Sequence, residues 1–305
     1  MTHALDPVAV SLARAQQGML TTAQARAAGL SPFALARLVQ QDILKHPGRG
    51  LYAVASLVDT APEAWHRHLM SGARLMYPDA VFTGVSAVLA HEVRVWDADL
   101  ARPQLLRPVR RGTTMACFHL RPERAGATIA TELGETVLLA DALVQLAADD
   151  GIASGVASMD HALHEGKVTR DELEAALDAV ALWPGSSRAK SAVLHSDGRR
   201  ESVAESRCAL VMALKGIDVI PQFEVRDPKG DFVARVDFLI EGTNIVIEVD
   251  GKVKYASGDP EVLWAEKKRE DDIRRAGCVV VRVTWADLER LDRLVAKVSQ
   301  ALRAA

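Results

Sequence analysis

The sequence predicts a multi-domain α/β protein, and three features along the chain support that prediction. Near the N-terminus, short helical segments follow one another and end in two short extended segments. In the middle, helical periodicity surrounds a pair of extended segments. Toward the C-terminus, a helix, three strands, a long charged helix and a last apolar strand come in that order. At 305 residues we expect domains over residues 1–57, 58–195 and 196–305.

The composition limits the classes of protein to consider. Hydrophobic residues make up 49% of the chain and charged residues 25%, which is typical of a soluble globular protein. The net charge of -3 means that any nucleic-acid surface must be local. The cysteines stand far apart without metal-ligand spacing, as reduced thiols do. No signal peptide or membrane-spanning run is present, so we expect a cytoplasmic protein without a membrane partner.

The first domain shows the signals of a winged helix-turn-helix. PVAVSLARAQQG reads as a short helix with Pro7 near its start. Thr21 or Thr22 can cap the next helix, and Ser31 opens a third, FALARLVQQ. The continuation DILKHPGRGLYAVA supplies two extended segments around His46-Pro47-Gly48, which predicts a small hairpin after the last helix.

A winged helix places its last helix in the major groove and lets the wing contact phosphates. The polar side chains available for DNA on these elements are Arg37, Gln40, Gln41, Lys45 and Arg49. Residues 1–60 hold five Lys or Arg against three Asp or Glu, so the basic charge is weak. The same fold also serves protein–protein contacts, and the sequence leaves that alternative open.

The stretch LTTAQARAAGLSPFALARLVQQDILKHPGRGLYAV, residues 20–54, resembles the N-terminal winged helix of AbiEi-family antitoxins. The helix, the turn, the second helix and the GRGLYAV wing come in the order of that family. The resemblance implies a DNA-binding transcriptional regulator of a type IV toxin–antitoxin system, with a cognate toxin as partner. It extends loosely into the middle region.

Residues 58–195 predict an α+β region that is mainly helical. VFTGVSAVLAHEV and ETVLLADALVQLAA read as helices, and LLRPVRRGTTMACFHL as a strand pair or hairpin. WPGSSRAK and HSDGRR have the composition of a linker to the last domain. His161 and His164 share a helix face, and His66 and His68 lie on another segment, but no carboxylates complete a metal site. We expect these histidines to be solvated.

The last domain places carboxylates inside apolar runs. VDFLIEGTNIVIEVDGK carries Asp237 in the first run and Glu248 with Asp250 in the second. An unpaired buried charge costs several kcal/mol, so these acids need cationic partners, a metal or exposure. Strand alternation puts Glu248 and Asp250 on one face, and the neighbouring strand brings Asp237. Converging carboxylates bind Mg²⁺, so we expect these three side chains to be metal ligands.

The order of helix, three strands, helix and strand is that of the PD-(D/E)XK nuclease core. The run VDFLIEGTNIVIEVDGK, the preceding helix and the tail AEKKREDDIRRAGCVVVRVTWADL resemble the very-short-patch-repair endonucleases. The resemblance implies a restriction-endonuclease-like mixed sheet flanked by helices. It also implies hydrolysis of DNA phosphodiester bonds with Mg²⁺ or Mn²⁺. Carried over by position, Asp237 and Glu248 bind the metal, Glu205 is the acid from the first helix, and Asp250 lies beside the site.

The chain departs from this motif at its lysine. Asp250 stands where the motif has lysine, and the nearest lysine that follows is Lys252. Lys252, or Lys267 from the long helix, could stabilise the charge on the phosphate, and the activity of the site stays open. The EKKRED helix face is either solvated or in contact with phosphates through Lys267, Lys268, Arg269 and Arg274.

Each acid also has a structural interpretation. Ser202 and Glu205 have the spacing of a capping box, in which the glutamate reaches back to its own helix terminus. Asp237 could pair with Arg235, and Glu248 with the lysine after its strand.

Two functional hypotheses follow. The first is a metal-dependent DNA endonuclease that a winged helix recruits to DNA. The second is a non-enzymatic antitoxin or transcriptional repressor with a degenerate nuclease fold. A protein-interaction scaffold is a weaker third. DNA is the partner in the first two hypotheses, a toxin protein only in the second, and a homodimer is compatible with either.

Overall fold

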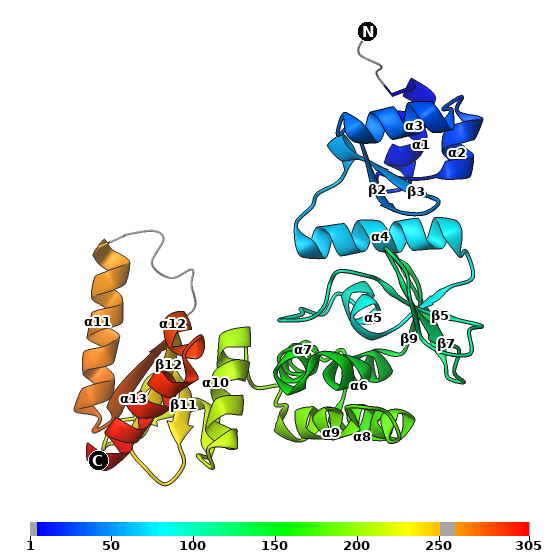
Figure 1. Cartoon of the computed structure of the whole chain (residues 1–305). Helices are drawn as coiled ribbons and strands as arrows, with labels where there is room; N and C mark the ends of the chain where they lie inside the picture. Colours follow the sequence, from blue (N-terminus) through cyan, green and yellow to red (C-terminus); the bar gives the residue numbers. More distant parts are fainter. Residues whose placement is uncertain (1–4, 251–259, 305) are drawn as a thin grey trace.

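The computed structural model describes residues 5–250 and 260–304 of the chain. Within them it is a multi-domain α/β structure with three separate sheets among its helices. Figure 1 shows the N-terminal helices at one end, with α4 (Pro62–Met76) next to them. The C-terminal sheet lies beside α10 (Val203–Leu214) at the other end. No described helix is long and apolar enough to cross a membrane.

The N-terminal region is a winged helix, as predicted. Its elements are α1 (Pro7–Ala15), β1 (Met19–Thr21), α2 (Thr22–Ala27), α3 (Pro32–Gln40), β2 (Leu44–Gly48) and β3 (Leu51–Val54). The strands form an antiparallel sheet in the order β1-β3-β2. Thr21 caps α2 in a capping box with Gln24, and Ser31 caps α3.

The wing turns later in the chain than predicted. His46 lies inside β2, and the chain reverses at Arg49 and Gly50 instead. Gly50 has φ +89°, a left-handed conformation that glycine adopts without steric cost. Strand β1 was not predicted, because three residues are too few to show a period of two.

The middle region combines a mixed sheet with packed helices. The sheet has six strands among the described residues, in the order β6-β7-β5-β4-β9-β8. Their bounds are β4 (Val81–Phe82), β5 (Gln104–Arg107), β6 (Thr113–Thr114), β7 (His119–Pro122), β8 (Thr128–Thr131) and β9 (Gly134–Val137). The helical bounds are η1 (Ala55–Leu57), α5 (Gly84–Ala90), α6 (Leu139–Asp150), α7 (Ile152–His164), α8 (Arg170–Val180) and α9 (Ser186–His195). The strand pair or hairpin predicted for LLRPVRRGTTMACFHL is confirmed, because β6 and β7 form an antiparallel hairpin and β5 pairs with β7 in parallel.

The predicted linker between the middle and last regions is also wrong. SSRAK begins α9, whose Ala189 and Ala192 are fully buried in the core of the middle region. The HSDGRR stretch that follows is anchored rather than loose. Nη1 of Arg200 donates to Asp160 Oδ2 at 2.9 Å and to the carbonyl of His195 at 2.8 Å. Asp160 lies on α7, which packs beside α10 (Figure 1), so the last region is held to the middle one.

The last region has the predicted order of elements. Its described elements are α10, β10 (Val219–Arg226), β11 (Phe232–Ile240), β12 (Ile245–Asp250), α11 (Pro260–Arg275), β13 (Val279–Thr284), α12 (Trp285–Leu288) and α13 (Leu291–Ala304). The mixed sheet runs β10-β11-β12-β13, with only the β12–β13 pair parallel among these described strands.

Strand β12 divides its side chains between two faces. Ile245, Ile247 and Val249 pack in one core with apolar side chains of α10 and α13. Val246 packs on the other face against Ile273 of α11. This alternation confirms the predicted pattern and turns the even-numbered carboxylates toward the α11 side.

Candidate functional site

The outer face of α3 carries side chains suited to reading DNA. Leu35 and Leu38 are buried in the winged-helix core, so the opposite face is turned outward. Phe33 is 78% exposed on that face, and Arg37 and Gln40 follow at helical spacing. The face therefore offers an aromatic ring, a guanidinium and an amide to base edges in a major groove.

The remaining predicted DNA contacts lie next to this face. Gln41 follows the last residue of α3, Lys45 lies on β2, and Arg49 stands in the wing turn; all three are exposed. His46 stacks on Tyr52 with ring centroids 4.8 Å apart, which holds the two wing strands together. An exposed arginine at a wing tip has the geometry for a phosphate contact.

Asp237 lies where β11 leaves its partner strand. The antiparallel pairing of β11 with β12 ends at Phe238 and Ile247. One residue earlier, Oδ2 of Asp237 accepts a hydrogen bond from the backbone N–H of Val249 at 2.6 Å. The side chain thus replaces a backbone acceptor and fixes the carboxylate between the two strands.

Glu205 of α10 lies near the same place. Its Oε1 accepts from the Ser202 hydroxyl at 2.7 Å, and its Oε2 accepts from the Glu201 N–H at 3.1 Å. Glu205 therefore reaches back to the start of its own helix, as predicted, but it accepts from the N–H of Glu201 instead of that of Ser202, so the capping box is incomplete. Oε2 also accepts from Gln222 Nε2 at 3.0 Å, and Gln222 has φ +53°, a strained value for this residue type. Burial raises the pKa of Glu205, and the Asp237 charge raises it further.

Glu248 is buried and paired with an arginine. It is 6% exposed, and Arg269 of α11 donates to Oε1 from Nη2 at 2.7 Å and to Oε2 from Nη1 at 3.0 Å. Burial raises the pKa of Glu248, Arg269 opposes that rise, and Asp237 adds to it. The expected partner, Lys252, lies outside the described residues. Arg235, the expected partner of Asp237, pairs with Glu201 at 3.0 Å instead.

Asp250 belongs to an adjacent network centred on Arg282 of β13. Nη1 of Arg282 lies 3.3 Å from Asp250 Oδ1 and donates to Glu266 at 2.8 Å, while its Nε donates to Glu270 at 2.8 Å. Burial alone would lower the pKa of Arg282, but these carboxylates raise it above its usual range. Sequence reasoning missed Arg282, although an arginine between valines in VVVRVT indicates a buried ion pair.

The carboxylates do not form a metal site in the part of the chain that the structure describes. No group of three or more His, Cys, Asp and Glu residues there is arranged to hold an ion. The charge of Asp237 raises the pKa of both Glu205 and Glu248. Carboxylate oxygens suit Mg²⁺ or Mn²⁺. However, Arg269 occupies both oxygens of Glu248, and the cap occupies those of Glu205, so this arrangement does not fit an ion.

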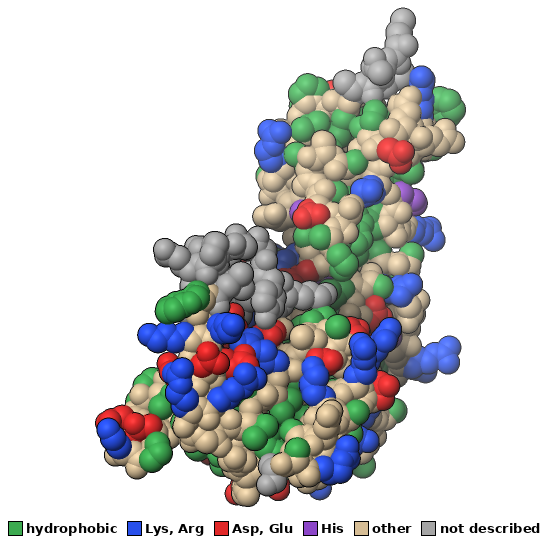
Figure 2. Space-filling model, turned by 90° about the vertical axis from the view of Figure 1, so that its left-hand side faces the viewer, with side chains coloured by type: hydrophobic (Ala, Val, Ile, Leu, Met, Phe, Trp, Pro, Cys, Tyr) green, Lys and Arg blue, Asp and Glu red, His purple; other side chains and the backbone are tan. Residues whose placement is uncertain are grey.

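The charged face of α11 is largely occupied by contacts within the protein. Arg274 pairs with Glu270 at 2.5 Å, and the Lys268 ammonium lies 5.9 Å from the centre of the Trp264 ring. Lys267 is exposed. Figure 2 shows basic and acidic side chains intermixed over this side of the molecule, which favours a solvated face over a phosphate-binding one.

The histidines of the middle region are not all solvated, so that prediction is wrong in part. His66 is fully buried, with Nδ1 2.9 Å from the Leu100 carbonyl and Nε2 2.9 Å from the Ser86 hydroxyl. Burial lowers its pKa. His68 and His164 bind backbone groups at the surface. None of these contacts suggests a metal role.

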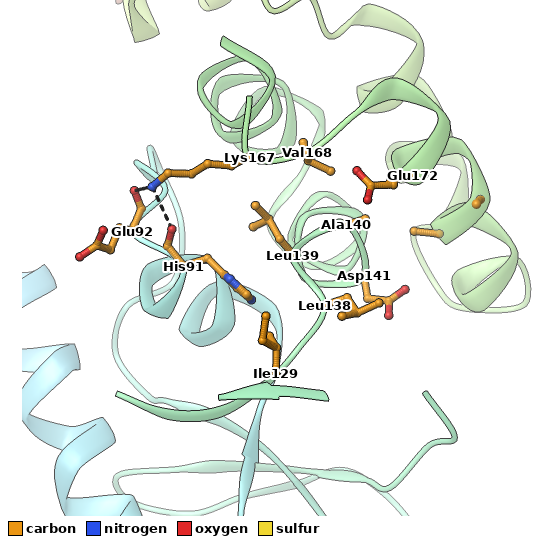
Figure 3. Close-up of a pocket in the computed structure, with 12 residues that line it drawn as sticks. His91, Glu92, Ile129, Leu138, Leu139, Ala140, Asp141, Lys167, Val168 and Glu172 are labelled. Atoms are coloured by element: carbon orange, nitrogen blue, oxygen red, sulfur yellow. Dashed lines mark hydrogen bonds between the residues drawn. The ribbon is translucent and has the colours of Figure 1, made fainter. Parts of the chain in front are cut away.

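A cavity of about 720 Å³ opens between the end of α5, the β9–α6 turn and α8 (Figure 3). Leu138, Leu139 and Val168 give it apolar walls. Lys167 also lines the cavity. Its Nζ donates to the backbone carbonyl oxygens of His91 and Glu92 near the end of α5. The side chains of His91, Glu92, Asp141 and Glu172 complete its polar lining.

Comparison with known protein families finds a match for the winged helix. Residues 8–55 match the family described as transcriptional regulator, AbiEi antitoxin. The match confirms the resemblance predicted for the N-terminal region and indicates a DNA-binding transcriptional regulator. It ends before α4 and does not cover the acid cluster, by which we mean Glu205, Asp237, Glu248 and Asp250. No curated protein matches the chain.

Proposed function

We propose that this protein is an antitoxin-type transcriptional regulator that binds DNA through its winged helix and acts without enzymatic activity. The match of residues 8–55 carries the proposal. It is supported by the exposed face of α3, where Phe33, Arg37 and Gln40 stand together, and by Arg49 in the wing. In this proposal a toxin is the protein partner, as the name of the matched family suggests.

The pairing of the acids supports a structural role for the C-terminal region. Glu248 and Asp250 each lie against an arginine, and Glu205 reaches back to the start of its own helix. A buried carboxylate that is paired and hydrogen-bonded needs no metal to offset its desolvation. The region then serves to hold the sheet together and to present surfaces for assembly.

The DNA-binding proposal is tested by charge removal on the winged helix. Arg37→Ala and Arg49→Ala should each weaken binding of duplex DNA by the full-length protein. Each lost phosphate contact should lower the slope of log K against log salt by about 0.9. Fluorescence anisotropy over a range of salt concentrations measures both effects, with Arg14→Ala on α1 as the matched control. Unchanged slopes in both variants would mean that the winged helix meets protein instead.

A second candidate function is cleavage of DNA at the acid cluster. The observation that favours it is the order of the C-terminal elements, which is that of the PD-(D/E)XK core, with the charge of Asp237 raising the pKa of both Glu205 and Glu248. Mg²⁺ or Mn²⁺ would take Asp237 and Glu248, with Asp250 beside them, only after Arg269 moved away. The described arrangement does not fit the ion, and no catalytic step is derived from it.

The two candidates differ in what happens to plasmid DNA. Under the regulator proposal, plasmid incubated with the protein and Mg²⁺ or Mn²⁺ stays intact on a gel. The nuclease candidate requires cutting that a chelator prevents. It also requires that Asp237→Ala and Glu248→Ala each abolish cutting, while Lys267→Ala shows whether a helix lysine takes part. Metal-dependent cutting that survives both acid substitutions would indicate a contaminating nuclease.

A further inference from the structure

Strand β8 leaves one edge of the middle sheet open. It pairs with β9 on one side, and no strand of the described residues pairs with it on the other side. None of its residues is charged, and Thr128, Ile129 and Ala130 are exposed. Proteins usually protect such edges with charged side chains or proline, because an open edge is a template for a further strand.

The backbone groups of β8 that face the open edge follow from its pairing. The Ile129 carbonyl oxygen accepts from the Thr136 hydroxyl of β9 at 3.2 Å, so the backbone of Ile129 faces β9. Backbone groups alternate in direction along a strand, so those of Thr128 and Ala130 face the open edge. Among the described residues, no backbone hydrogen bond joins β8 to another segment on that side. These groups are therefore open to an incoming backbone.

The cavity of about 720 Å³ adjoins this edge. Ile129 lines it from β8, and Leu138 lines it from the turn after β9 (Figure 3). Ile129 is 47% exposed and Leu138 is 42% exposed, so both apolar side chains meet water. In an added strand, alternate side chains would point to the face on which Ile129 lies. One of them would then enter the cavity, whose volume suits a large side chain.

The polar lining of the cavity is acidic. Glu92, Asp141 and Glu172 bring three carboxylates, against the single ammonium group of Lys167, which donates to two backbone carbonyl oxygens. Asp141 is half-buried and has neither a hydrogen bond nor an ion pair with any described residue. Burial raises the pKa of Asp141, and the charge of Arg124 opposes that rise. A ligand cation beside Asp141 would stabilise its charged form.

We infer that β8 and this cavity bind an extended segment of a protein partner, in which an apolar residue and a lysine or arginine stand two positions apart. The segment adds a strand to the open edge. Its apolar side chain enters the cavity beside Ile129 and Leu138, and its cation lies at Asp141. Strand addition takes affinity from main-chain hydrogen bonds and specificity from pockets for alternate side chains. The inference goes beyond the proposed function, because neither DNA nor the winged helix takes part.

A second copy of this chain suits the edge less well than a basic segment does. Strand β8 carries no cation that could meet the carboxylates of the cavity. Pairing of two β8 strands about a two-fold axis would also bring two identical acidic cavities toward each other, and like charges repel. Charge complementarity therefore favours a basic partner.

The test begins with random peptides displayed on phage and selected on the immobilised full-length protein. We expect one recurrent motif, with an apolar residue and a lysine or arginine two positions apart. Fluorescence anisotropy with a labelled synthetic peptide of that motif then measures affinity. Ala130→Pro should weaken binding about tenfold, because proline removes an outward N–H group and obstructs the added strand. Proline is tolerated at an edge residue whose N–H faces solvent, so the pairing with β9 remains.

Two milder variants test the cavity without proline. Leu138→Ser should weaken peptide binding about fivefold, because it removes an apolar wall. Serine also suits this position, since Leu138 is the N-cap of α6 and makes no capping hydrogen bond there. Asp141→Asn should weaken binding about threefold and lower its dependence on salt. The matched control is Asp171→Asn on α8, an exposed carboxylate that does not line the cavity.

Three results would overturn the inference. The first is a selection that yields no recurrent motif, or one without basic residues. The second is a motif peptide that binds Leu138→Ser and Asp141→Asn as tightly as it binds the wild type. The third is a wild-type dimer in sedimentation equilibrium that Ala130→Pro converts to a monomer, which assigns the edge to a second copy of the chain.

Discussion

Arg200→Met should lower the free energy of unfolding of the full-length protein by about 3–5 kcal/mol, because it leaves a buried carboxylate without its cation. The partner, Asp160, is 1% exposed in its side chain, and the arginine side chain is 10% exposed. Urea titration followed by tryptophan fluorescence measures the loss. The double variant Asp160→Asn/Arg200→Met should regain part of the lost free energy of unfolding, because it buries no unpaired charge.

The matched control is Arg199→Met, at the residue that precedes Arg200. Arg199 is 60% exposed in its side chain and pairs with Asp197 at the surface. Arg199→Met should cost less than about 1 kcal/mol, as exposed ion pairs do. Equal losses in the two methionine variants would show that Arg200 is no more structural than a surface residue, and that the regions are joined in another way.

Arg269→Met should destabilise the C-terminal region by about 2–3 kcal/mol at pH 7. The substitution leaves Glu248 buried near Asp237 without its arginine. The loss is smaller than for Arg200 because Arg269 is 37% exposed in its side chain, where water screens the pair. Arg275→Met on the same helix removes an exposed arginine and is the control.

The pH dependence of this loss has a definite sign. Burial already raises the pKa of Glu248, and without Arg269 it should rise further. A carboxyl whose pKa is higher in the folded than in the unfolded state destabilises the fold as pH rises from the unfolded pKa to the folded one. The stability difference between variant and wild type should therefore be largest near pH 7 and shrink toward pH 4. A stability difference that grew on acidification would mean that Glu248 is not the group that loses its ion-pair partner in Arg269→Met.

Local chemistry explains why much of the fold was predictable. Thr21, Ser31 and Ser202 are helix caps in the structure because their hydroxyls accept from backbone N–H groups three residues on, a relation visible in sequence. The two faces of β12 followed from a period of two. Each signal lies within a few residues of the feature that it predicts.

The predictions failed where tertiary packing, and not the local sequence, determines the secondary structure. The start of helix α9 is rich in Gly and Ser, which predicted a linker. Its Ala189 and Ala192 side chains are nevertheless buried in the core of the middle region. Such packing stabilises short helices whose intrinsic helix propensity is low. The addition of β5 in parallel to the β6–β7 hairpin depends on long-range pairing that a local pattern does not encode.

The acid site was predictable only in part. The convergence of Asp237, Glu248 and Asp250 stays a prediction from element order. The pairing of Glu248 with Arg269 joins residues on separate elements. The left-handed backbone of Gln222, which donates to Glu205, has no sequence signal. Which cation neutralises a buried acid is set by the docking of α11, and local patterns do not encode it.

The central claim is that the winged helix makes this protein a regulator that reads DNA sequence. Its most direct test is selection from a random-sequence DNA pool by the full-length protein and by its Arg37→Ala variant. The account predicts that the wild type enriches one recurrent motif, and that the variant loses enrichment at one or more positions of that motif, because base contacts specify sequence. A wild-type pool without any enriched motif, or identical motifs from both proteins, would contradict it.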